Sequence, residues 1–193
     1  EARRRYRLVM TRTRDIYVSL EDRVRLSREV GADLFLSLHA DATEQAVASV
    51  RGASIYTLSS RASNAAARRF AQKENAADLL AGFAIASDAS AGSVEGILID
   101  LLKRETQMLS LRAREAIVDA LGDTVLLSGD PRRAAAFKVL KQTETPSVLI
   151  ELGYISNPLD EREMRTEKWR NKVAEAIARA VDAFFRRAGS AMR

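Results

Sequence analysis

The chain contains no cysteine and only one histidine in 193 residues. Without cysteine there is no disulfide framework and no thiolate metal site, so the redox compartment stays open. A bound metal ion would have to use histidine, aspartate or glutamate side chains. No apolar run approaches the ~20 residues of a membrane-spanning helix, and "EARRRYRLVM" lacks the apolar core of a signal peptide. We therefore predict no membrane span, and an exported form would have lost its targeting signal.

Glycine and proline are also scarce, at 9 and 3 residues, while 47% of the chain is hydrophobic and 30% is charged. This composition is typical of a globular protein, and the length predicts a single domain over residues 1–193. Lysine and arginine outnumber aspartate and glutamate by 31 to 26, which gives a formal charge of +5. The surplus favours a polyanionic neighbour: nucleic acid, anionic lipid or an anionic wall polymer.

Strand-like and helical segments alternate along the sequence. The expected strands cover residues 6–13, 33–40, 52–59, 136–141 and 146–156. Between the first two, a helix begins near Ser19 and stops at Gly31. Because the run 33–40 is nearly continuously apolar, it is typical of a strand covered on both faces. The pattern predicts an α/β fold with a mostly parallel sheet.

Residues 60–121 are predicted to form a long helical insertion between strands. Its second half carries an apolar stripe, interpreted as a core-facing side, at Val94, Ile97, Leu98, Leu101, Met108, Leu111 and Val118. Further on, Asn157 has the features of an N-cap, with Pro158 at the first helical position. The last predicted helix, residues 167–187, has one apolar face for packing against the sheet.

Two residues interrupt this pattern in a way that indicates chemistry. His39 lies near the end of its predicted strand, where open α/β sheets bind ligands, and it is the only nitrogen ligand for zinc in the chain. Glu151 places a carboxylate inside the apolar run "SVLIELGYI", where an unpaired buried charge costs several kcal/mol. Taken alone, His39 could be a structural histidine, and Glu151 could pair with an arginine or lie where the strand opens to water. Together they predict one metal-assisted hydrolytic site.

Four ordered motifs make a family resemblance specific: "MTRTRD" at 10–15, "SLEDRVRLSREVGADLFLSLHADA" at 19–42, "KENAADLL" at 73–80 and "PSVLIELGYISNPLDEREM" at 146–164. They strongly resemble the zinc-dependent N-acetylmuramoyl-L-alanine amidases of the bacterial cell wall (Amidase_3 type), over nearly the whole chain. The resemblance implies a twisted, mostly parallel sheet flanked by helices, phosphorylase/hydrolase-like. It also implies Zn²⁺ as the cofactor, His39 as a metal ligand and Glu151 as the catalytic general base, with no other cofactor site. The bond cut would join N-acetylmuramic acid to L-alanine of the stem peptide.

One departure from the family's pattern bears on activity. Its first histidine ligand lies in an Asp-Pro-Gly-His-Gly loop and its glutamate ligand opens the next helix, whereas this sequence starts later. We therefore expect a domain that lacks its first strand and helix. Two of three protein ligands would be missing, and catalytic zinc sites need about three. The chain as given is expected to bind zinc weakly and to be inactive, either as a truncated form or through natural loss.

The insertion at 60–121 resembles the autoinhibitory insertion of family members that separate daughter cells. By that resemblance Glu74 in "KENAADLL" would contact the zinc until a LytM-type activator displaces it; otherwise Glu74 is a solvated helix residue. The implied setting is the periplasm or another exported location, with peptidoglycan as substrate and a monomeric chain. Two alternatives stay open: a non-catalytic relative that binds peptidoglycan or a division partner, and a nucleic-acid-binding domain. The second lacks stacking aromatics and a recognition helix, so we expect no nucleic-acid partner.

Overall fold

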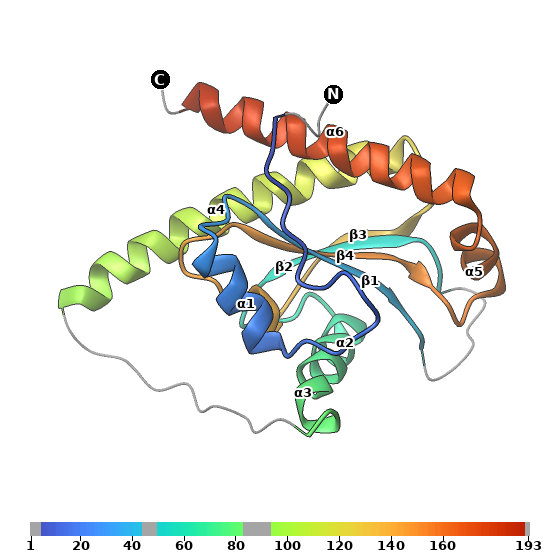
Figure 1. The fold of residues 1–193 in the computed structure, drawn as a ribbon, viewed down its shortest axis with the longest axis horizontal. Helices are drawn as coiled ribbons and strands as arrows, with labels where there is room; N and C mark the ends of the chain where they lie inside the picture. The colour runs from blue at the N-terminus through green and yellow to red at the C-terminus, as the bar shows by residue number, and fades with distance from the viewer. Residues whose placement is uncertain (1–4, 44–49, 83–93, 192–193) are drawn as a thin grey trace.

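The computed structural model describes residues 5–43, 50–82 and 94–191, and these build one sheet with helices on both faces (Figure 1). The strands are β1 (Phe35–Asp41), β2 (Ala53–Leu58), β3 (Leu127–Ala135) and β4 (Ser147–Tyr154). Their order across the sheet is β1-β4-β2-β3. β1 runs parallel to β4 and β2 parallel to β3, while β2 and β4 are antiparallel. The predicted α/β class is confirmed, as a mixed sheet with two parallel pairs and one antiparallel pair.

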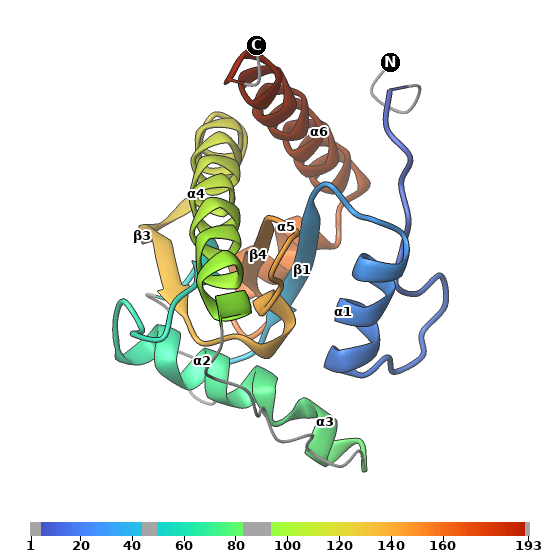
Figure 2. The ribbon, with the colours of Figure 1, turned by 90° about the vertical axis from the view of Figure 1, so that its left-hand side faces the viewer.

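The helices form a layer on each side of the sheet. They are α1 (Leu20–Glu29), α2 (Ala65–Asn75), α3 (Ala77–Leu80), α4 (Val94–Gly122), α5 (Pro158–Met164) and α6 (Glu167–Ala191), with a 3-10 turn, η2, at Lys138–Leu140. Figure 2 shows α4 and α6 on one side of the strands, and α1 with α2 on the other. No helix within the described ranges is both long enough and apolar enough to cross a membrane.

Each face of the sheet has its own apolar core. Under α4 and α6, the fully buried Ile55, Val148 and Ile150 of the strands pack against helix residues such as Ile117 and Phe184. The other core includes Phe35, Tyr56, Leu149, Phe137 and the alanines of α2. Because neighbouring strand residues point to opposite faces, odd-numbered residues of β1 and β4 face the α1 and α2 side. His39 and Glu151 belong to that odd-numbered set.

Local signals in the sequence place several helix ends. The Ser19 hydroxyl accepts the Asp22 N–H and caps α1, and Gly31, at φ +60°, follows its end. Asn157 caps α5, with Pro158 at the first helical position, as predicted. The predicted apolar face of the last helix is also confirmed, since Val173 and Phe184 are buried.

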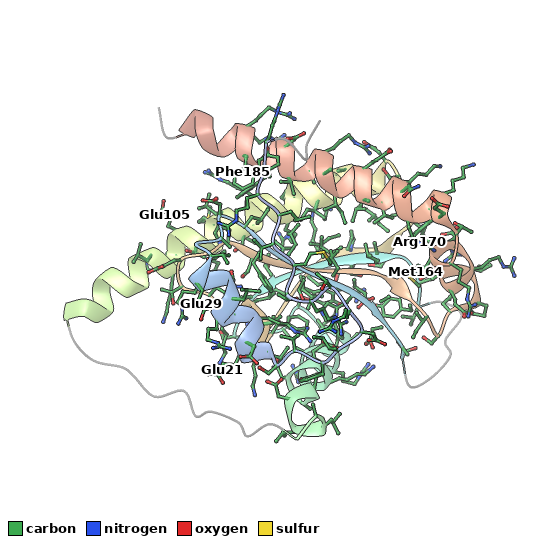
Figure 3. All side chains as sticks on the ribbon, in the orientation of Figure 1. Glu21, Glu29, Glu105, Met164, Arg170 and Phe185 are labelled. Carbon is green, nitrogen blue, oxygen red and sulfur yellow. The ribbon has the colours of Figure 1, made fainter. Side chains whose placement is uncertain are left out.

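The strand predicted at residues 6–13 is absent. Among the described residues, this segment pairs with no strand and crosses α6, where the Tyr6 hydroxyl donates to Asp182 (2.9 Å). Tyr6 also stacks on Phe185, with ring centroids 5.3 Å apart; Figure 3 shows Phe185 where this segment passes. Leu8 and Met10 are 86% and 63% exposed. A segment with a strand-like sequence forms a strand only when a neighbouring strand pairs with its backbone N–H and C=O groups.

The strand predicted at residues 136–141 is also wrong. β3 precedes it, at Leu127–Ala135, and residues 138–140 form the turn η2. The segment "LSGDPRRAA" was missed because glycine, proline and charges are rare inside central strands, but β3 is an edge strand, where proline is tolerated. The apolar residues that suggested a strand are buried in and beside the turn instead: Phe137, Val139 and Leu140.

The described part of the insertion is mostly helical, as α2, α3 and α4 between β2 and β3, while residues 60–64 and 81–82 lie outside helices. Residues 83–93 lie outside the described residues, as do the side chains of residues 94–101. Part of the expected α4 stripe is wrong: Met108 is 55% exposed, although Val118 is buried. The buried face of α4 comprises Ala113, Ala116, Ile117, Val118 and Leu121.

Candidate active site

His39 and Glu151 occupy paired positions on neighbouring parallel strands. The register of β1 and β4 places His39 opposite Glu151, and both side chains lie on the face covered by α1 and α2. The His39 side chain is 13% exposed and Glu151 is fully buried. The two strands therefore bring together the two residues singled out in the sequence.

Glu151 has one satisfied oxygen and one without a partner. The N–H of Asp41 donates to its Oε1 (2.9 Å), while Oε2 is buried and has no hydrogen-bond partner among the described residues. Burial raises the pKa of Glu151 to about 8, and the nearby carboxylates of Asp41 and Glu74 act in the same direction. A buried carboxyl group with an unsatisfied oxygen and a pKa near neutrality has the properties of a proton acceptor and donor.

His39 is held from two sides. Its Nε2 is 2.9 Å from the Ser37 hydroxyl, two residues back on the same face of β1. The Phe70 ring of α2 meets the imidazole edge-on, with centroids 6.0 Å apart. Burial, together with the positive charge of Arg23, lowers the pKa of His39 to about 4. The imidazole is therefore neutral at pH 7, which is the form that binds metal ions.

Glu74, from α2, completes the group by facing the imidazole. Its Oε2 is 3.4 Å from Nδ1 of His39, and its side chain is 20% exposed. Burial raises the pKa of Glu74, and Asp41 adds to the increase. Because His39 is neutral at pH 7, the contact is not an ion pair. Glu74 is therefore mostly buried against His39, unlike a solvated residue on a helix surface.

The spacing of these atoms can be compared with a zinc site. Ligands about 2.0–2.2 Å from a tetrahedral zinc ion lie about 3.3–3.6 Å apart, a range that includes the 3.4 Å between Nδ1 of His39 and Oε2 of Glu74. The Ser37 hydroxyl at Nε2 corresponds to the outer hydrogen bond of most metal-binding histidines. However, no group of three metal-ligating side chains occurs in residues 5–43, 50–82 and 94–191. The described residues fit part of a zinc site.

The residues beside Glu74 attach α2 to the body of the protein. Lys73 Nζ donates to Asp41 Oδ1 (2.5 Å) and to the carbonyl of Ala42 (2.9 Å), at the end of β1. No motif in the sequence indicates a role for Lys73 or Asp41, nor for Ser37 or Phe70. Their contacts join segments far apart in the chain, so sequence spacing alone carries no signal for them.

Asn75, two residues after Lys73, binds the turn η2 through both the nitrogen and the oxygen of its side-chain amide. Its Nδ2 donates to the carbonyl of Ala136 (2.7 Å), and its Oδ1 accepts the N–H of Lys138 (2.8 Å). Two backbone groups that form no strand pairing are thereby satisfied by a side chain. Lys73 and Asn75 fix Glu74 between two attachment points.

A cavity of about 580 Å³ opens elsewhere in the molecule, where α4 ends and α6 begins. Trp169, Arg162 and Lys172 are among the residues that line it. None of His39, Glu74 and Glu151 belongs to its lining. The candidate site is therefore a cluster of side chains under α2 rather than this cavity.

Comparison with solved structures shows that this α/β fold is the fold of amidase catalytic domains. The amidase AmiC2 of Nostoc punctiforme aligns with a TM-score of 0.57 at 24% identity, over 92% of this chain and 72% of that one. The catalytic domain of the amidase CwlV from Bacillus (Paenibacillus) polymyxa var. colistinus has the same TM-score at 21% identity, over 92% and 71%. At such identities the likeness concerns the fold.

The sequence comparisons identify the family. The family model described as N-acetylmuramoyl-L-alanine amidase matches residues 1–183 of the sequence, so the chain belongs to that family. It is 38% identical to the amidase AmiA of Salmonella typhimurium over 177 residues, and 35% identical to AmiC of Escherichia coli O6:H1 over 180 residues. These alignments cover 91% and 93% of this chain but only 60% and 42% of the two relatives.

Proposed function

We propose that this chain carries the catalytic centre of a peptidoglycan hydrolase that cuts the amide bond between N-acetylmuramic acid and L-alanine. Membership of the amidase family supports the substrate and the bond. The observation that carries the proposal is the pairing of His39 with Glu151, whose Oε2 is buried and has no partner among the described residues. Such a pair at one end of two strands is suited to metal-assisted hydrolysis.

In this mechanism His39 is a zinc ligand and Glu151 is the general base. Zinc, when bound, polarises the amide carbonyl and acidifies a water molecule. The charge of a bound zinc ion would lower the pKa of Glu151 and keep its carboxylate ionised, so that Oε2 could accept the proton of the water and deliver it to the leaving nitrogen of L-alanine. The hydrogen bond from Asp41 N–H to Oε1 fixes the carboxylate, so that Oε2 alone takes part in proton transfer.

Glu74 is proposed to block this centre. A carboxylate beside His39 would compete with the reactive water for a coordination position of a bound ion. The segment 60–121 would then be autoinhibitory, and an activator, of LytM type by the family resemblance, would have to remove Glu74. Partner binding has one parallel among the structural neighbours: the CwlD amidase from Clostridioides difficile was solved in complex with the GerS lipoprotein.

The setting proposed for this reaction is the cell wall, in the periplasm or another exported location, during cell separation. A relative from Staphylococcus epidermidis that is 28% identical, LytH, is named as a probable cell wall amidase, which supports the location. Within the described residues His39 has no second histidine beside it. We therefore propose that the chain alone binds zinc weakly, and that a form which supplies the remaining ligands is active.

A second candidate is a non-catalytic relative that binds peptidoglycan or a division partner. The absence of a three-residue metal group from the described residues favours it. Zinc content and catalysis decide between the two. We would measure bound zinc and release of stem peptides from purified peptidoglycan, for this chain and for a form extended upstream with the missing ligands.

The extended form is expected to bind one zinc ion and release stem peptides, and Glu74→Gln should raise its basal rate. Glu151→Gln should lower that rate by about 10²–10⁴-fold, because general-base catalysis contributes that much. The glutamine has the same shape and keeps an oxygen for the Asp41 N–H, so the fold should persist. Full activity of Glu151→Gln, or no zinc in the extended form, contradicts the proposed function.

A further inference from the structure

Asp78 attaches the end of the α2–α3 segment to the beginning of α1. The Tyr17 hydroxyl donates to its Oδ1 (2.6 Å), and so does the N–H of Leu20, the first residue of α1 (2.9 Å). The partners are separated by 61 and 58 positions in the sequence. Asp78 is 9% exposed, and its bond to the Leu20 N–H is buried, whereas the bond from Tyr17 is partly open to water because Tyr17 is 41% exposed.

No apolar side chain of α3 is buried. Asp78 is its one buried residue, while Leu79 and Leu80 are 53% and 86% exposed. In contrast, Ala67 and Ala71 of α2 are buried in the core below the sheet. The attachment of α3 therefore depends on the two hydrogen bonds of Asp78, whereas α2 has an apolar face of its own.

We propose that Asp78 is a release latch: while its carboxylate binds Tyr17 and α1, Glu74 stays against His39, and when those bonds break, the α2–α3 segment moves and uncovers the imidazole. The inference rests on the blocking role proposed for Glu74. Asp78 follows Glu74 by about one helical turn, so a displacement of α3 acts on Glu74 through the end of α2, where it has to overcome the bonds of Lys73 and Asn75.

The chemistry of the contact suits a reversible latch. Hydrogen bonds to a shielded carboxylate are strong, but water replaces them once the segment opens. Burial, together with the hydrogen bond to Asp78, raises the pKa of Tyr17 to about 12. The phenol therefore stays protonated and remains a donor throughout the physiological pH range.

The test uses amide hydrogen exchange of the 193-residue chain, without zinc or substrate. Asp78→Ala removes both bonds and should speed exchange of residues 70–80 by at least about 10-fold, with β4 unchanged. Tyr17→Phe removes one bond and should give a smaller increase. Asp78→Asn keeps an acceptor oxygen and should remain within about 3-fold of the unmodified chain. Leu80→Ala, at an exposed position of the same helix, is the matched control and should change nothing.

The single histidine supplies a second readout. In a ¹H–¹³C spectrum, Glu74→Ala defines the His39 imidazole signal when Glu74 is absent. The signal of Asp78→Ala should move from the unmodified position towards that reference. An unmoved His39 signal, unchanged exchange at residues 70–80, or equally faster exchange throughout the chain would each overturn the latch. None of these results depends on peptidoglycan cleavage, so failure of the latch is distinguishable from failure of the proposed function.

Discussion

At the scale of single residues, the candidate site consists of side chains that conflict with their local pattern. Glu151 places a charge inside a buried strand, and His39 is the only imidazole at the end of another. The structure pairs the two across β1 and β4. Ser37 gave no such signal, because a serine in a strand is ordinary. Its role comes from the two-residue period of the strand, which puts its hydroxyl beside Nε2 of His39.

We predict that Ser37→Ala weakens zinc binding by the extended form about 10-fold. Hydrogen bonds to the second nitrogen of a metal-binding histidine orient the ring, and their loss costs about 10–100-fold in affinity. Competition with a chromophoric chelator measures the dissociation constant. Ser60→Ala, at an exposed serine, is the control. Equal affinities of the Ser37 variant and the unmodified protein would show that Ser37 does not support the ligand.

At the scale of elements, β1, β2 and β4 could be predicted because each is a run of apolar residues with strand propensity. β3 could not, because its sequence is polar and contains proline, and its position at the edge of the sheet is a property of the whole fold. The segment 6–13 shows the opposite error. Its apolar residues fit a strand, but strand formation requires a neighbour that local sequence does not reveal.

The junction of β2 and β3 depends on one glycine. Gly52 has φ +84°, and a Cβ built there would lie 2.8 Å from the backbone carbon of Leu127. Its N–H also donates to the buried Asp160 carboxylate (2.8 Å). An alanine would combine left-handed backbone strain with overlap against main-chain atoms that cannot rotate away.

We predict that Gly52→Ala lowers the free energy of unfolding by about 2–3 kcal/mol, since each such strained position costs about 1–3 kcal/mol and the overlap adds to it. Urea denaturation followed by circular dichroism measures the change. Gly129→Ala is the matched control: a Cβ there meets no atom within 4 Å, and Gly129 does not have a positive φ. A Gly52 variant as stable as the Gly129 variant would contradict the argument.

At the scale of the whole molecule, the sheet separates stability from function. The core under α4 and α6 contains no candidate catalytic residue, whereas His39, Glu74 and Glu151 all lie on the side of α1 and α2. The sequence motifs identified these three residues. They did not reveal that Lys73, Asn75 and Asp78 bind three separate elements, since those contacts exist only after the sheet and α1 have come together.

The positive charge is the remaining property of the whole chain, and it leads to a prediction about wall binding. A formal charge of +5 attracts a polymer whose stem peptides carry carboxylates. At ~0.1 M salt, exposed charges are screened beyond about 10 Å, and at ~1 M beyond about 3 Å. We therefore expect the fraction of chain that sediments with insoluble peptidoglycan to fall several-fold between low and high sodium chloride.

Two comparisons make that measurement specific. Peptidoglycan with amidated carboxylates should bind less chain at low salt, because it offers fewer negative charges. Glu151→Gln should bind as the unmodified chain does, since position 151 is fully buried and contributes nothing to the outer surface. Binding that is independent of both salt and amidation would mean that the wall is recognised by shape and neutral hydrogen bonds, and the arginine and lysine surplus would then have no part in it.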